Sequence, residues 1–171
     1  MMENFEVSDP TLNSTALTLR GHDTKDDIEL QRLWLAARRR DWRSLAVIAA
    51  SPTADTLPIA ELLASLAWSY RGQPSSVMDL RDLSLRLAEY HQRQVEALLA
   101  RGSIVVIALR SIHENPTAAA VARAADATLL CVDIGHSLLR VAEQTIAEVG
   151  RERVLGAVVV RRPRAQAPGR P

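Results

Sequence analysis

The chain has 171 residues, enough for one domain with a substantial core, and its formal net charge is +1. This balance excludes the broad basic field of a nucleic-acid-binding protein, and no apolar stretch approaches the ~20 residues that cross a bilayer. The polar, acidic N-terminus does not resemble a signal peptide. The single cysteine, Cys131, lies in an apolar run, as expected of a core residue in a reducing compartment. We therefore expect a cytoplasmic protein.

Residues 1–25 are expected to form a flexible arm, because Ser, Thr, Asn, Asp and Gly outnumber large apolar residues there. Residues 26–161 are predicted to form a single α/β domain, and the Pro-, Arg- and Ala-rich residues 162–171 a disordered tail. Strands are predicted at 45–50, 75–80, 103–109, 127–134 and 153–160, and helices at 26–40, 57–71, 83–101, 116–125 and 137–149. This alternation indicates a three-layer αβα sandwich around a mainly parallel, five-stranded sheet.

Helix ends and faces follow from individual residues. Thr56 is predicted to cap the second helix, and Gly72 is placed to end it. In the third helix, the apolar side chains predicted to face inward are those of Leu83, Leu87, Val95, Leu98 and Leu99.

The arginines at the end of the first helix allow two interpretations. Arg38, Arg39, Arg40 and Arg43 could form an anion- or membrane-binding patch. The favoured interpretation is a solvated helix end, where cations complement the helix dipole.

The strand–loop–helix unit at residues 44–70 lies where α/β proteins commonly hold a phosphate. Its loop, residues 51–56, lacks the residues this needs. No glycine occurs between Gly21 and Gly72, and the only lysine, Lys25, lies far upstream. We predict that the loop forms no ring of inward-pointing N–H groups, and that Leu57 turns toward apolar surface instead.

Several short segments of the sequence resemble those of a known protein family. Glu29 and Arg32 are three residues apart in the first helix, with Leu35 three residues further on. The second strand ends in Val77-Met78-Asp79-Leu80-Arg81, and Ala50-Ser51-Pro52-Thr53 opens the loop at 51–56. Residues 124–132 and 154–160 supply the phrases that open the fourth strand and form the fifth.

These phrases resemble the MinD/ParA-type P-loop ATPases, and within them the cytoplasmic kinase domain of bacterial tyrosine kinases that control exopolysaccharide and capsule export. The resemblance implies a P-loop NTPase-like fold. The family's Glu-x-x-Arg-x-x-Arg helix serves ring assembly, so Glu29 and Arg32 are implied contact residues, with Leu35 in the third position. The family's Walker A core is replaced by residues 54–59, and its Walker B aspartate is missing from residues 107–110.

Three residues near the loop are candidates for a degenerate nucleotide or metal site. Asp79 ends the second strand, where α/β folds place functional groups, and Asp55 and Thr56 could join it in holding a cation. The competing interpretation is that these residues serve turns and helix caps. With the phosphate cradle absent, we expect no cofactor, ATP and Mg²⁺ included, no metal, and no catalytic residue in this group.

A second candidate is a crevice at the carboxyl ends of the strands. His113 follows the third strand, and Asp133 and His136 follow the fourth, so all three could approach Asp79. Residues in exposed loops are more often simply solvated.

The favoured hypothesis is a catalytically inactive pseudo-kinase that acts as a partner in exopolysaccharide biosynthesis or export. As the resemblance implies, its partner would be an inner-membrane polysaccharide co-polymerase or assembly protein, or another copy of itself. It would then lie in the cytoplasm, peripheral to the inner membrane through that partner. The alternatives are a residual nucleotide-binding ATPase or kinase with a non-standard loop, and a MinD/ParA-like positioning or scaffold protein.

Overall fold

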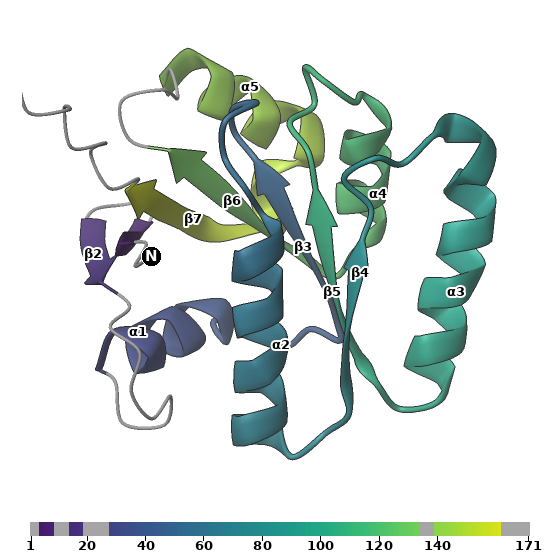
Figure 1. The fold of residues 1–171 in the computed structure, drawn as a ribbon, viewed down its shortest axis with the longest axis horizontal. Coiled ribbons are helices and arrows are strands. Elements are labelled where there is room, and N and C mark those ends of the chain that lie inside the picture. Colours follow the sequence, from purple (N-terminus) through teal and green to yellow (C-terminus); the bar gives the residue numbers. More distant parts are fainter. Residues whose placement is uncertain (1–3, 9–13, 19–27, 134–138, 162–171) are drawn as a thin grey trace, which may run out of the picture.

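The computed structural model describes residues 4–8, 14–18, 28–133 and 139–161. A seven-stranded sheet, ordered β2-β1-β7-β6-β3-β5-β4, forms the middle layer (Figure 1). Its parallel part comprises β3 (Ser44–Ala49), β4 (Ser75–Asp79), β5 (Ile104–Leu109), β6 (Ala127–Asp133) and β7 (Val154–Arg161). The predicted three-layer α/β sandwich is confirmed.

The helices divide between the two faces of the sheet. One core lies under α1 (Ile28–Ala37) and α2 (Leu57–Arg71), and the other under α3 (Ala88–Ala100), α4 (Thr117–Ala124) and α5 (Leu139–Val149). Leu45 and Val47 of β3 point into the first core, and Ala46 and Ile48 into the second. The apolar runs of β3 and β5 are therefore buried at every position, which explains why neither alternates in polarity.

The N-terminal region differs from the expected arm. β1 (Asn4–Ser8) and β2 (Ser14–Thr18) form an antiparallel pair, and β1 continues the sheet antiparallel to β7. A two-stranded addition of this kind covers the exposed N–H and C=O groups along one edge of β7. The alternating segment Asn4-Phe5-Glu6-Val7-Ser8 was the available sequence signal.

The predicted helix over 83–101 begins later than expected. Residues 85–87 form a 3₁₀ turn, and α3 starts at Ala88. The side-chain amide of Asn115 donates to the Leu83 carbonyl at 2.6 Å, so a tertiary contact takes up this carbonyl ahead of the helix. Leu83 is buried as predicted, but Leu87 is 51% exposed, so its predicted inward position is wrong.

An aromatic cluster joins α1 to the end of α2. The Arg71 guanidinium lies 4.8 Å from the ring centroid of Trp42 and 5.5 Å from that of Trp34, and it donates to the Trp42 carbonyl at 2.7 Å. The Trp42 indole N–H donates to the Ala37 carbonyl at 2.7 Å. Gly72, with a φ of 64°, ends α2 as predicted. These contacts hold α1 against the domain.

Asp126 fixes the start of the central strand. Its carboxylate accepts hydrogen bonds from the backbone N–H groups of Arg43, at 2.9 Å, and Ser44, at 2.8 Å, and its own N–H donates to the Ser44 hydroxyl. Partial burial opposes ionisation, but the two N–H donors outweigh it and hold the pKa of Asp126 below its usual value.

We predict that Asp126→Asn lowers the free energy of unfolding at pH 7 by about 1 kcal/mol, a hydrogen-bond value reduced for solvent exposure. Because the folded-state pKa is lowered, the wild-type advantage is full above pH ~4 and disappears as the pH falls through the folded-state pKa. Urea denaturation across this range measures it. Glu143→Gln on α5 is the control, since that side chain is exposed and its loss should change little. Equal stability of Asp126→Asn and wild type at pH 7 would contradict the assignment.

Candidate functional site

A cavity of about 200 Å³ lies at the carboxyl edge of the sheet, where three loops meet. One loop joins β3 to α2, one follows β4, and one follows β5. The residues that line the cavity are Pro52, Thr53, Ala54, Asp55, Thr56, Arg81, Leu109, Arg110 and Glu114. The cavity therefore occupies the place where the sequence located a degenerate nucleotide site.

The loop over 51–56 uses its polar groups internally. The Ala54 N–H donates to the Ser51 carbonyl at 3.2 Å, and the hydroxyls of Ser51 and Thr53 lie 3.1 Å apart. Leu57 packs against the core under α1 and α2, as predicted.

Asp55, and not Thr56, supplies the side-chain hydrogen bond at the start of α2. The Thr56 hydroxyl makes no cap bond; it is fully buried and donates to the Leu109 carbonyl at 3.0 Å, which ties the loop to β5. The Asp55 carboxylate accepts the Leu57 N–H at 3.2 Å and so supplies the side-chain contact at the start of α2. Thr56 occupies the N-cap position of α2, as predicted, but it makes no side-chain cap bond because the Leu109 carbonyl of the neighbouring strand takes its hydroxyl.

Arg81 joins the two predicted acidic residues. Its guanidinium holds Asp79 through two hydrogen bonds of 2.8 Å and reaches Asp55 at 2.8 Å. In the sheet, β5 separates β3 from β4, so Arg81 spans the end of an intervening strand. The hydrogen bonds from Arg81 hold the pKa of Asp79 below its usual value, and these partners raise the pKa of Arg81.

A second arginine, Arg110, also lines the cavity. Arg110 contacts Asp82 at 3.0 Å and Glu114 at 3.6 Å. The sequence interpretation gave no role to Arg81 or Arg110. The spacing of Asp79 and Arg81 was the one local signal, since side chains two residues apart can pair where a strand turns.

The proposed crevice residues lie apart from this cavity. Asp133 is 1% exposed at the end of β6, and His113 is exposed after β5; neither lines the cavity. His136 lies outside the described residues. Among the residues that the structure describes, no cluster of three or more His, Cys, Asp or Glu side chains could hold a metal ion.

Helix α1 carries the predicted contact residues. Arg32 is exposed, and Leu35, one turn further on, is 68% exposed. Glu29 lies in the first turn, although its side chain is outside the part that the structure describes. Leu33, Trp34 and Ala37 bury the opposite face against the core, so the Arg32–Leu35 stripe faces outward.

No protein-family model matches this chain, and no curated protein matches its sequence. Among solved structures, the chimerical protein CapA2B2 is similar, with a TM-score of 0.61 and 12% identity over 83% of this chain and 88% of that chain. The likeness is one of fold. CapA2B2 thus gives a structural parallel for the arrangement of strands and helices described above.

We predict that Arg81→Met raises the pKa of Asp79 toward its ordinary value, because the hydrogen bonds from the guanidinium are the largest cause of its lowering. NMR titration of side-chain carboxyl carbons measures the change. Arg86→Met is the matched control, since Arg86 is exposed and close in sequence but has no place at the cavity. An unchanged Asp79 titration in Arg81→Met would rule out the bridge in solution.

Proposed function

We propose that this protein is a catalytically inactive relative of the P-loop kinases and ATPases, and that it acts as a partner or regulator in bacterial exopolysaccharide biosynthesis or export. The observation that supports catalytic inactivity is the Arg81 bridge between Asp55 and Asp79. A guanidinium already paired with both carboxylates takes the position that a divalent cation would need.

The loop supports the proposal independently. A phosphate site needs several backbone N–H groups that converge on one point. Here the N–H groups of Ala54 and Leu57 are bonded within the loop, and Pro58 has none. None of the glycines with positive φ, at positions 72, 102 and 150, lies in this loop.

Charge also disfavours a triphosphate. The ion pairs around the cavity bring together four carboxylates, those of Asp55, Asp79, Asp82 and Glu114, with the guanidinium groups of Arg81 and Arg110. The acidic excess repels an anionic ligand, and each arginine would have to leave a carboxylate to meet a phosphate.

The link to polysaccharide biosynthesis rests on the family resemblance. The sequence segments quoted above resemble those of the tyrosine kinases of capsule and exopolysaccharide export, and the fold that this chain shares with CapA2B2 is compatible with that resemblance. No helix in the described part of the chain is long and apolar enough to cross a bilayer. As the resemblance implies, we assign as partner an inner-membrane polysaccharide co-polymerase or assembly protein, or another copy of this chain.

The cavity itself favours one competing function, residual nucleotide binding, since it keeps the position of a nucleotide site. We predict that calorimetry with ATP and Mg²⁺ at millimolar concentration detects no binding to the wild-type protein. The double variant Leu57→Gly with Pro58→Lys should also fail to bind, because the Arg81 bridge and the missing Walker B carboxylate remain. Micromolar ATP binding by the wild-type protein would replace the proposal with this competing function.

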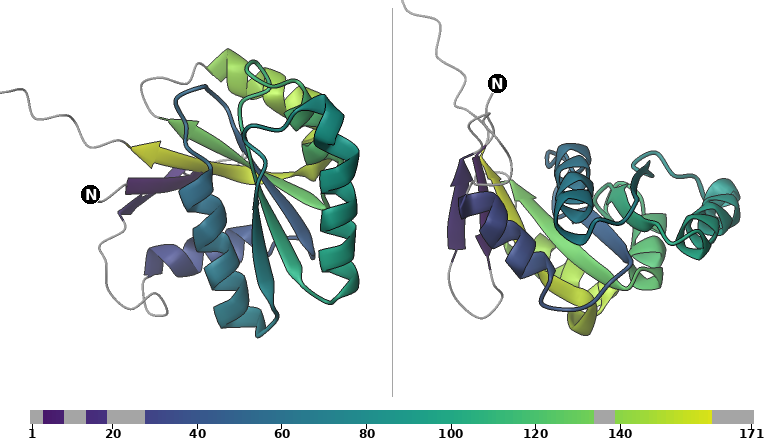
Figure 2. Two further views of the ribbon diagram at one scale, coloured as in Figure 1. Left: turned by 45° about the vertical axis from the view of Figure 1, so that its right-hand side comes forward. Right: turned by 90° about the horizontal axis from the view of Figure 1, so that it is seen from below.

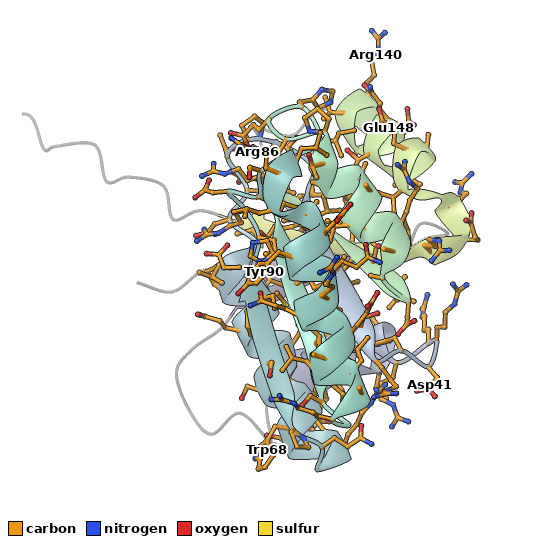
Figure 3. All side chains as sticks on the ribbon, turned by 90° about the vertical axis from the view of Figure 1, so that its right-hand side faces the viewer. Asp41, Trp68, Arg86, Tyr90, Arg140 and Glu148 are labelled. Carbon is orange, nitrogen blue, oxygen red and sulfur yellow. The ribbon has the colours of Figure 1, made fainter. Side chains whose placement is uncertain are left out.

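The partner contact is predicted to involve the exposed stripe of α1. Arg32→Glu should reduce co-purification of a membrane polysaccharide-assembly protein at least tenfold, because it reverses a charge in the proposed interface. Quantitative mass spectrometry of affinity-purified material from cells measures this. Arg140→Glu on α5 is the matched control, and Figure 3 shows that side chain reaching into solvent. Recovery of unrelated soluble enzymes alone would reject the partner role.

A further inference from the structure

An apolar cleft of about 270 Å³ lies between α3 and α4. Leu80 and Ile107 form its floor, Val95 and Leu99 line it from α3, and Ala120 and Val121 line it from α4. Figures 1 and 2 show α3 standing beside the rest of the domain, and Figure 3 views its outer face. This cleft is separate from the cavity beside Arg81.

Helix α3 is fastened near its two ends and packs loosely between them. Asn115 holds the Leu83 carbonyl ahead of the helix, and the Arg43 guanidinium donates to the Leu99 carbonyl near its end. No side chain of α3 is fully buried, and Val95, Leu98 and Leu99 are only partly buried against the core. An amphipathic helix that buries none of its apolar face completely leaves room for another apolar group.

The chemistry of the lining selects the class of ligand. The large side chains of the floor and walls are aliphatic, and none of the lining residues is a Phe, Tyr, Trp, Lys or Arg. The polar groups at the rim already have partners within the protein. Gln92 bonds Glu96, His91 bonds Gln94, and Asp126 binds the start of β3.

These observations argue against an anionic headgroup as the source of affinity, because the lining holds no Lys or Arg and includes the carboxylates of Glu96 and Asp126. They also disfavour a polar ligand, which would have to break existing hydrogen bonds. Burial of an aliphatic chain remains as the driving force. A dry apolar cavity of about 150 Å³ holds benzene, and on that scale a 270 Å³ cleft holds a chain of about ten carbons.

We infer that the cleft between α3 and α4 binds the aliphatic chain of a lipid-type amphiphile and leaves its headgroup in solvent. Leu85 extends the apolar lining outward; it is 78% exposed and also borders the cleft. The chain would complete the burial of Val95 and Leu99, so binding should stabilise the folded protein. This inference does not depend on the proposed function.

The test uses alkyl phosphocholines with chains of about six, eight, ten and twelve carbons, each below its micellar concentration. Calorimetry on the full chain should give an affinity that rises roughly fifteenfold for each two-carbon step and levels off near ten carbons. Alkyl maltosides of the same chain lengths should bind within about threefold of the phosphocholines, because the headgroup makes no contact. Absence of binding, or affinity that follows the headgroup instead of the chain, would overturn the inference.

Matched variants locate the site. Ala120→Phe fills the cleft from an exposed position on α4 and should abolish binding of the ten-carbon probe, while Ala97→Phe, exposed on α3 outside the lining, should leave it unchanged. Ala124→Phe, which also borders the cleft, replaces Ala120→Phe if circular dichroism shows that variant unfolded. Undiminished binding in a folded cleft-filling variant would contradict the site. If no alkyl probe binds and Ala120→Phe instead prevents recovery of a protein partner, the cleft is a helix-docking groove and the inference is wrong.

Discussion

Strand β3 is the constraint on which the other elements depend. It is paired on both edges, with β5 and β6, and buried on both faces, so none of its residues can shift register without exposing apolar surface or losing a hydrogen-bond ladder. Asp126 holds its first residues, and its last residue leads directly into the loop at 51–56. The position of that loop, and hence of the cavity beside it, follows from the burial of one short apolar segment.

At the carboxyl edge of the sheet, the Arg81 guanidinium supplies the positive charge that pairs with Asp55 and Asp79. Arg81 links the loop after β3 to the end of β4, across the end of the intervening strand β5. The Thr56 hydroxyl adds a bond from the same loop to the end of β5. These interactions within the chain fix the relative positions of the loops that line the cavity.

Continuous apolar runs made most of the parallel sheet predictable, since β3, β5, β6 and β7 lie within one residue of the segments expected from sequence. Features that depend on residues far away in the sequence were harder to predict. Thr56 bonds a strand 53 positions away, and the late start of α3 accompanies a bond from Asn115. The role of Arg81 could not be derived, because it requires the order of strands in the sheet. The hairpin of β1 and β2 was missed because each strand has five residues and the surrounding sequence is polar.

The loose packing of α3 also bears on how the folded protein opens locally. Residues 85–100, which comprise the 3₁₀ turn and α3, bury no side chain completely, and they follow β4, a sheet-edge strand of intermediate burial. A contiguous segment with so little buried surface opens at a lower free-energy cost than the body of the domain. We therefore expect amide hydrogens in α3 to exchange with solvent through a sub-global opening, and those of β3 and β5 to exchange only when the whole domain unfolds. The native state is then expected to comprise a rigid body and one cooperative unit that can open separately.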